Sequence, residues 1–397
     1  MRVLFTTQAG AGTFHPLVPL AHALTAAGHE VAFACSRPFC VTVEAAGFRA
    51  YPAGFDAAGR SLPDFLPEIR GMAVDEQNDY VYQRWFAGIT AEAMVPDLLA
   101  LARSWCPDVL VRDTTEFGGC VAAEVLGLPH ASVRSSSLAS AYARRHVVRE
   151  PLERLRTAHG LAPDPDMAML FRYLHLAFEP PGFRPPGEPA APTAHLLRPV
   201  ATDPDGDEAV PAWVGQLRRQ PTVYVTLGTV PEWNRVSGLF PTILAALRDE
   251  PLNVIATVGR NQDPAAFGPQ PPHVRIERYI PQRLLLPYCN LMIAHGGFNT
   301  VLGALSAGVP LVILPVSADQ PMNARSCATL GVAKVVGPED RTPATIREAV
   351  REVLDDAGYR QRARRLVAAI QTLPGPEHGV ALLERLATER RPLPAAR

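Results

Sequence analysis

Short apolar runs alternate with longer amphipathic segments along the first half of the chain. In the first amphipathic segment, Leu17, Leu20 and Leu24 recur at helical spacing. The apolar runs have the length of buried strands and comprise residues 3–6, 31–35, 108–112 and 130–133. Repeated strand–helix units predict a parallel sheet that is covered by helices on both faces.

The second half repeats this alternation after a stretch that is dense in proline and glycine. Residues 180–189 and 203–207 have the composition of a connection between domains. We expect an α/β protein with one domain at residues 1–205, a second at 206–376 and a C-terminal helix at 377–397. The apolar runs of the second half comprise residues 222–227, 253–258, 274–279, 291–294 and 309–314.

Residues 290–320 combine a strand, a glycine turn and a helix. The first N–H groups of a helix lack partners within the helix and carry partial positive charge, so such a turn binds anions. The turn and the helix start supply these donors, namely His295, Gly296, Gly297, Asn299 and Thr300. A diphosphate would fit there, although a tight turn without a ligand stays open from this stretch alone.

Composition argues against several classes of function. The 397 residues carry a formal net charge of −1, which disfavours nucleic acid and anionic membranes as partners. We find no apolar run as long as a membrane span. The N-terminus enters a strand directly, without the layout of a signal peptide, so we expect a cytoplasmic protein. The six cysteines show no metal-binding spacing, and we expect free thiols.

The glycines after the first strand, Gly10 and Gly12, match a dinucleotide-binding fingerprint only weakly. The sixth position of that fingerprint is His15 rather than glycine or alanine. The second strand ends at Cys35 and Ser36, where an acidic residue would bind the ribose. A nicotinamide-dependent reaction is therefore a poor hypothesis.

A longer pattern surrounds the glycine turn. The sequence RYIPQ (278–282) precedes it, and ADQPMN (318–323) follows the next apolar run. This order and spacing resemble the donor-binding signature of family 1 nucleotide-sugar glycosyltransferases. The resemblance is closest to bacterial enzymes that glycosylate polyketides and other natural products, and it extends over nearly the whole chain.

This resemblance implies a fold and an activity. The implied fold is GT-B, with two doubly wound Rossmann-like domains facing a cleft and the C-terminal helix packing back on the first domain. The implied activity is inverting transfer of a sugar or deoxysugar from a nucleotide diphosphate to an apolar acceptor, such as a polyketide or an enediyne intermediate. We expect a TDP-sugar donor, with a UDP-sugar as the alternative. We expect no metal, because the strand-end loops hold no DxD-type acidic pair. The oligomeric state stays open.

The resemblance also assigns roles in the second domain. Tyr279 is expected to stack on the nucleobase, Ile280 to bind the base edge through its backbone, and Gln282 to contact the ribose or to cap a helix. Asp319 and Gln320 are expected to bind sugar hydroxyls. The expected diphosphate ligands, which would stabilise charge on the leaving group, are Gly228, Thr229, His295, Gly296, Gly297, Asn299 and Thr300.

The first domain departs from the family pattern at the general base. In the family, a histidine in the first loop takes the acceptor proton, and an aspartate from a later loop orients it. Asp113 matches the aspartate, but Thr13 occupies the position of the histidine and His15 lies two residues later. Three explanations stay open. His15 acts as base from a shifted loop, or Asp113 with Thr13 as relay supports an acceptor that loses its proton readily, or the protein is a poor catalyst or an auxiliary.

Two less regular stretches, around residues 55–85 and 134–178, correspond to the walls of the acceptor pocket in the family. Aromatic side chains suit a large apolar acceptor, whereas core packing is the alternative for any one of them. The candidates are Phe14, Phe55, Tyr80, Trp85 and Tyr142, with Phe171, Tyr173 and Phe178 in the second stretch. Two other functions stay open: a non-catalytic nucleotide-sugar-binding or activator protein of the same fold, and a nucleotide-sugar epimerase.

Overall fold

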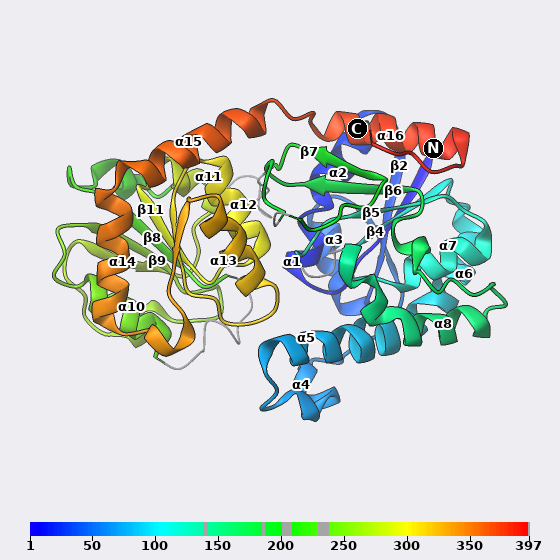
Figure 1. Cartoon of the computed structure of the whole chain (residues 1–397), viewed down its shortest axis with the longest axis horizontal. Coiled ribbons are helices and arrows are strands. Elements are labelled where there is room, and N and C mark those ends of the chain that lie inside the picture. The colour runs from blue at the N-terminus through cyan, green and yellow to red at the C-terminus, as the bar shows by residue number, and fades with distance from the viewer. Residues whose placement is uncertain (138–141, 185–186, 201–208, 229–237, 396–397) are drawn as a thin grey trace. The chain divides into compact units, whose positions relative to one another are not determined.

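The computed structural model describes residues 1–137, 142–184, 187–200, 209–228 and 238–395. The chain divides into two compact units (Figure 1). The first unit comprises Met1–Phe178, Gly187–Arg198 and Pro374–Arg397. The second comprises Glu179–Pro186 and Pro199–Leu373. The divisions after residues 198 and 373 lie slightly before the boundaries expected after residues 205 and 376.

The first unit contains a parallel sheet in the order β3-β2-β1-β4-β5-β6-β7. Both faces of such a sheet are covered, which explains why its strands are continuous apolar runs. The strands are β1 (Arg2–Thr6), β2 (Glu30–Cys35), β3 (Arg49–Pro52), β4 (Val109–Asp113), β5 (His130–Val133), β6 (Leu174–Phe178) and β7 (Ala194–Leu197).

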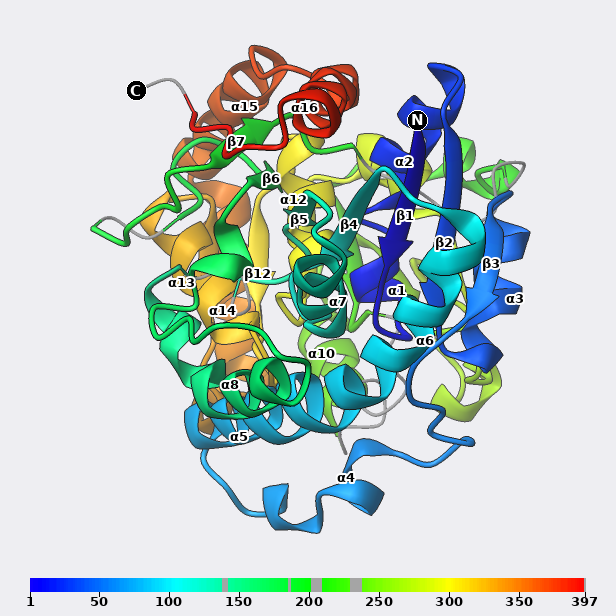
Figure 2. The same ribbon diagram turned by 90° about the vertical axis from the view of Figure 1, so that its right-hand side faces the viewer.

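Helices pack on both faces of this sheet. Leu20 of α2 and Leu383 of α16 lie in the core on one face, so the C-terminal helix packs within the first unit. Leu98 of α6 and Val121 of α7 lie in the core on the other face, which is the near side in Figure 2. The helices are α1 (Ala11–Phe14), α2 (Val18–Ala26), α3 (Cys40–Ala45), α4 (Leu62–Phe65), α5 (Val74–Val81), a π-helical segment (Tyr82–Thr90), α6 (Ala91–Trp105), α7 (Gly118–Leu126), α8 (Arg149–Ala158) and α16 (Pro376–Glu389).

The second unit contains a parallel sheet in the order β10-β9-β8-β11-β12-β13. Its α12, α13 and α15 pack on one face, and α10 and α14 pack on the other. The strands are β8 (Thr222–Thr226), β9 (Asn253–Thr257), β10 (Val274–Glu277), β11 (Leu291–Ala294), β12 (Leu311–Ile313) and β13 (Ala333–Val335). The helices are α10 (Leu239–Leu247), α11 (Gln282–Leu285), α12 (Phe298–Ser306), α13 (Gln320–Thr329), α14 (Pro343–Asp355) and α15 (Ala357–Gln371).

Both sheets have the strand order of a doubly wound fold. The order reverses between β1 and β4 in the first unit and between β8 and β11 in the second. Ligands of such sheets bind beyond the carboxyl ends of the strands at this switch point. The predicted α/β architecture of two parallel sheets with flanking helices is confirmed.

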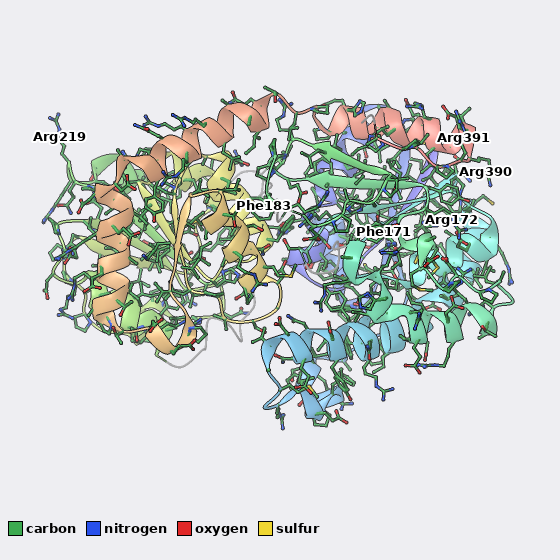
Figure 3. The ribbon with its side chains drawn as sticks, viewed as in Figure 1. Phe171, Arg172, Phe183, Arg219, Arg390 and Arg391 are labelled. Carbon is green, nitrogen blue, oxygen red and sulfur yellow. The ribbon has the colours of Figure 1, made fainter. Side chains whose placement is uncertain are left out.

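The first unit also contains elements that the sequence did not predict. Strand β6 lies in the stretch 134–178 that was expected to be irregular, and β7 follows after the proline-rich residues 180–189. Phe171 and Phe178 are each 5% exposed and belong to the cores on the two faces of the sheet (Figure 3 labels Phe171). Between α5 and α6 the helix widens into the π-helical segment Tyr82–Thr90.

The helical run Val74–Trp105 is long and apolar enough to cross a membrane by length and composition, contrary to our expectation from the sequence. About two-fifths of its most apolar window, 39%, is buried inside the protein. Met94 and Leu98 of this run belong to the core of the first unit, beside α7. Core helices meet the same length and composition test, so a single helix of this kind is weak evidence for a membrane span.

Candidate active site

In the first unit, the loops after β1 and β4 bring Gln8, Thr13 and Asp113 together. The two strands are parallel neighbours, with Thr6 opposite Arg112. The chain therefore leaves β1 beside the end of β4. This is the switch point of the first sheet, where a ligand is expected.

Asp113 is fully buried, and both of its carboxylate oxygens accept hydrogen bonds. Oδ2 accepts from the backbone N–H of Gln8 at 2.9 Å. Oδ1 accepts from the N–H of Thr115 at 2.6 Å and from the hydroxyl groups of Thr115 and Ser135. Burial raises the pKa of Asp113, while the hydrogen bonds from Thr115 and Gln8 act in the opposite direction.

Thr13 contacts Asp113 indirectly, through Gln8. The Thr13 hydroxyl donates to the carbonyl oxygens of Gln8 and Gly10, each at 2.9 Å. Its proton is therefore directed at the backbone, and the predicted relay from Thr13 to Asp113 is not a direct hydrogen bond. His15 follows the single turn of α1, half-buried, with its ring centroid 6.0 Å from that of Phe14.

The aromatic candidates fall into different environments. Phe14 is 2% exposed, and its ring packs on those of Phe33 and Phe39. It belongs to the core of the first unit, and its assignment to the acceptor pocket stays a prediction. Phe55 and Trp85 are half-buried, and their ring centroids lie 5.4 Å apart.

Phe65 completes this aromatic cluster, with ring centroids 5.3 Å from Phe55 and 5.2 Å from Trp85. The sequence offered no signal for Phe65, because the short helix α4 has no clear pattern. Tyr80 is half-buried, with the Arg84 guanidinium 6.0 Å from its ring centroid. Tyr142 is also half-buried and packs edge-on against Phe171.

In the second unit, His295 lies between two glycines at the switch point of the sheet. A Cβ on Gly228 would lie 2.6 Å from the imidazole Cε1, and one on Gly297 would lie 2.4 Å from Nε2. Any side chain at either glycine would displace the ring. Burial lowers the pKa of His295 to about 3, so the imidazole is neutral and offers a hydrogen bond rather than a charge. Thr229 lies outside the described residues.

The turn that follows His295 is fixed by its neighbours. Gly296 has φ +89°, and a Cβ there would lie 2.8 Å from Ile313 Cγ2. The buried amide of Asn323 donates to the Gly296 carbonyl at 2.9 Å. Gly297 caps α12 and contributes no side chain.

The first helical turn of α12 holds the remaining predicted diphosphate ligands. Asn299 and Thr300 both lie there, and both are half-buried. The turn after β11 thus leads directly into this nine-residue helix, so the helix N-terminus and the side chains of its first turn lie together at the end of β11. A helix start of this kind suits an anion.

The residues ahead of the turn take different positions. Tyr279 is half-buried, with the Arg260 guanidinium 3.9 Å from its ring centroid. Ile280 is 2% exposed. The amide of Gln282 donates to the carbonyl of Thr300 at 3.1 Å, so Gln282 fastens α11 to α12 rather than capping a helix.

The predicted sugar ligands come after β12. Asp319 is 8% exposed and immediately precedes α13. Gln320 is fully buried, and its carbonyl oxygen accepts from the N–H groups of Val316 and Ser317 at 2.7 and 3.0 Å. The side-chain oxygen of Gln320 therefore holds its own loop, and the expected contact of Gln320 with a sugar stays a prediction.

Sequence reasoning missed the roles of Gln8 and Asn323. Asn323 lies within the motif at 318–323, but its bond to Gly296 connects α13 to the turn after β11, which spacing does not reveal. Gln8 lies two residues beyond β1 and carries no motif. In the part of the chain that the structure describes, no group of three or more His, Cys, Asp or Glu side chains could hold a metal ion.

Comparison with known protein families places both units in one family. The family described as "Erythromycin biosynthesis protein CIII-like" matches through its N-terminal domain at residues 22–228 and through its C-terminal domain at residues 242–386. The chain belongs to this family, whose members are family 1 glycosyltransferases of macrolide and anthracycline antibiotic biosynthesis.

Individual relatives support the same assignment over the full length. The chain is 33% identical to 10-deoxymethynolide desosaminyltransferase of Streptomyces venezuelae, over 100% of this chain and 99% of that protein. Glycosyltransferase VinC, solved in complex with dTDP, is 28% identical with a TM-score of 0.79, covering 98% of this chain and 100% of VinC. Spinosyn rhamnosyltransferase SpnG complexed with thymidine diphosphate is 25% identical with a TM-score of 0.80, covering 97% and 100%. The fold is therefore GT-B, and the chain has a transferase role.

Proposed function

We propose that this chain is an inverting glycosyltransferase that moves a sugar from a TDP-sugar to an apolar, polyketide-type acceptor without a metal ion. The acceptor nucleophile forms a bond to the anomeric carbon on one face. The bond from that carbon to the diphosphate oxygen breaks on the other face, and TDP leaves. The proton of the nucleophile passes to a base or to water.

The donor site carries this proposal. The site consists of the His295 imidazole and the N-terminus of α12, both of which can donate hydrogen bonds. Gly228 and Gly297 lie against the imidazole, where any side chain would displace the ring. The neutral His295 and the helix N-terminus offer hydrogen bonds and partial positive charge to the leaving diphosphate, which is the role that a metal would otherwise have. The thymidine diphosphate bound to the similar proteins VinC and SpnG supports TDP as the nucleotide.

The first unit supports the transfer step through Asp113. A buried carboxylate at the switch point can orient or accept the proton of a nucleophile that is bound there. The half-buried rings of Phe55, Phe65 and Trp85 offer an apolar surface in the same unit, which suits a large aglycone. We propose this aromatic cluster as part of the acceptor site, with Tyr80 and Tyr142 as further candidates.

The test uses the full chain with a chelator present. TDP- and UDP-sugars are incubated with an aromatic polyketide aglycone or an enediyne aglycone, and free nucleotide diphosphate and glycosylated product are quantified by chromatography and mass spectrometry. We expect product and TDP in equal amounts. Donor conversion without acceptor would indicate an epimerase, and TDP binding without transfer would indicate a non-catalytic protein.

Gly297→Ala tests the proposed diphosphate site. The new methyl group would displace the His295 ring, and we expect TDP to bind about tenfold more weakly or worse, as for other overpacked sites. Gly215→Ala is the matched control, because Gly215 is exposed and a Cβ there meets nothing within 4 Å. Calorimetric titration with TDP gives the affinity, and an unchanged affinity in Gly297→Ala would refute this placement of the diphosphate.

A further inference from the structure

Gln8 connects the loop after β1 to two other segments of the first unit. Its side-chain amide donates to the hydroxyl oxygen of Thr90 at 2.9 Å and to the carbonyl of Thr115 at 3.4 Å. Its backbone N–H donates to Asp113, and its carbonyl accepts from Thr13. Gln8 therefore bonds both candidate catalytic residues through its backbone, and its own side chain is bonded to Thr90 and Thr115.

Thr90 is suited to anchor Gln8. It is 6% exposed and is the last residue of the π-helical segment Tyr82–Thr90. Its hydroxyl proton goes to the carbonyl of Phe86 at 3.1 Å, which leaves the oxygen lone pairs to accept from Gln8. π-helical turns are rare and occur often at functional sites.

The π-helical segment also carries Trp85 of the aromatic cluster Phe55–Phe65–Trp85. The hydrogen bond between Gln8 and Thr90 thus joins the helix that presents this cluster to the loop that carries Thr13. A shift of this helix would therefore move Gln8, and through the Gln8 N–H it would change the hydrogen bonding of Asp113.

We propose that Gln8 is a positioning residue of the transfer reaction. Its side-chain bond to Thr90 fixes the Gln8 backbone, which in turn keeps Thr13 and Asp113 at fixed positions relative to each other. The inference rests on the proposed glycosyl transfer. Gln8 acts through the other two residues. Without the anchor, the Gln8 backbone is free to move away from Asp113, which then loses one donor to its carboxylate.

Two variants remove the anchor from opposite ends. Gln8→Ala deletes the amide, and Thr90→Val deletes its acceptor. We expect kcat to fall about 10- to 100-fold in each, as for small misplacements of reacting groups. The double variant should lose no more than Gln8→Ala alone, because Gln8→Ala already removes the contact that Thr90→Val deletes, together with the longer bond to the Thr115 carbonyl. Thr90→Ser keeps the hydroxyl and should recover most of the loss. The TDP affinity should not change, since the proposed nucleotide site lies in the other unit.

A pH profile separates positioning from general damage to the fold. The N–H of Gln8 favours the anionic form of Asp113, so its loss raises the pKa of Asp113 and shifts the acid limb of the kcat profile to higher pH. The charged groups near Asp113 include Glu116 in the same loop and Arg112 on β4, and neither variant changes them. Thr25→Val is the matched control, because Thr25 also donates to a carbonyl four residues earlier in its helix, and it does not bond Gln8.

The outcomes are distinct. Lower kcat with a shifted acid limb, unchanged TDP affinity and recovery in Thr90→Ser would support the proposal. Gln8→Ala with wild-type kcat and an unshifted acid limb would overturn it while leaving the glycosyltransferase function intact. A wild-type protein that binds TDP but transfers no sugar to any acceptor would overturn the proposed function, and this inference with it.

Discussion

Glu116 provides a test of how burial affects the stability of the first unit. Its carboxylate is fully buried and accepts from the hydroxyl of Thr6 and from the N–H of Gly119 at 2.9 Å. Burial raises the pKa of Glu116 from its ordinary value of 4.5 to about 7, and the nearby charge of Asp113 adds to this effect. The hydrogen bonds and the charge of Arg112 act in the opposite direction.

The sign of the effect on stability follows from proton binding. Between pH 4.5 and pH 7 the folded chain keeps the proton of Glu116, whereas the unfolded chain has released it. The contribution of this group to stability is therefore fully present below pH 4.5 and is lost as the pH rises through about 7. The difference between the two pKa values corresponds to about 3 kcal/mol.

Glu116→Gln should remove this dependence. The amide resembles the protonated acid, because its oxygen can accept from the N–H of Gly119 and its nitrogen can donate to the Thr6 hydroxyl oxygen. We expect the free energy of unfolding of the wild type to decline relative to the variant between pH 5 and pH 8, by about 2.5 kcal/mol.

The assay is urea unfolding at pH 5, 6, 7 and 8, combined with hydrogen exchange of the β1 and β4 amides, so that unfolding of the first unit is observed directly. Glu92→Gln is the control, because Glu92 is exposed on α6 in the same unit. A difference between wild type and Glu116→Gln that is equal at pH 5 and pH 8 would refute the reasoning. The carboxylate would then titrate near its ordinary value despite its burial.

Three further predictions concern the two candidate sites. Asn323→Leu should weaken TDP binding several-fold, because the Gly296 carbonyl loses its buried donor. Calorimetric titration with TDP measures the affinity, and an unchanged affinity would contradict a role for Asn323 in holding the turn. Thr13→His should raise turnover on simple alcohol acceptors about tenfold or more by restoring an imidazole base, and His15→Ala should leave transfer to an acidic acceptor nearly unchanged. Product formation measures both, and abolished transfer in His15→Ala would indicate that His15 is the base.

The sequence was sufficient to predict where the strands that carry the two candidate sites end. A buried parallel strand is an apolar run, and a ligand-binding turn follows directly after it, so the ends of β1, β4, β8 and β11 are marked locally. Gly228 and Gly297 also lie just after strands, and the absence of a side chain at each leaves room for the His295 ring. These features depend on residues that are close together in the chain.

The directions of individual side chains could not be predicted in the same way. Gln282 and Gln320 belong to the donor motif, yet each bonds backbone of its own unit. Phe14 lies in the loop after β1, but the single turn of α1 directs its ring into the core. In each case a partner from another segment decides the orientation, and spacing in the sequence does not identify that partner.

The environment of Asp113 favours one of the three explanations for the missing histidine. In a His–Asp pair the carboxylate accepts an N–H from the imidazole. Here one oxygen accepts the N–H of Gln8, and the other accepts the N–H and hydroxyl of Thr115. The Thr13 hydroxyl, with its proton directed at backbone carbonyls, can still accept a hydrogen bond from a bound nucleophile. It cannot hold that proton at neutral pH. We therefore favour an acceptor that ionises readily, for which Asp113 supplies orientation and negative charge rather than a partner for an imidazole.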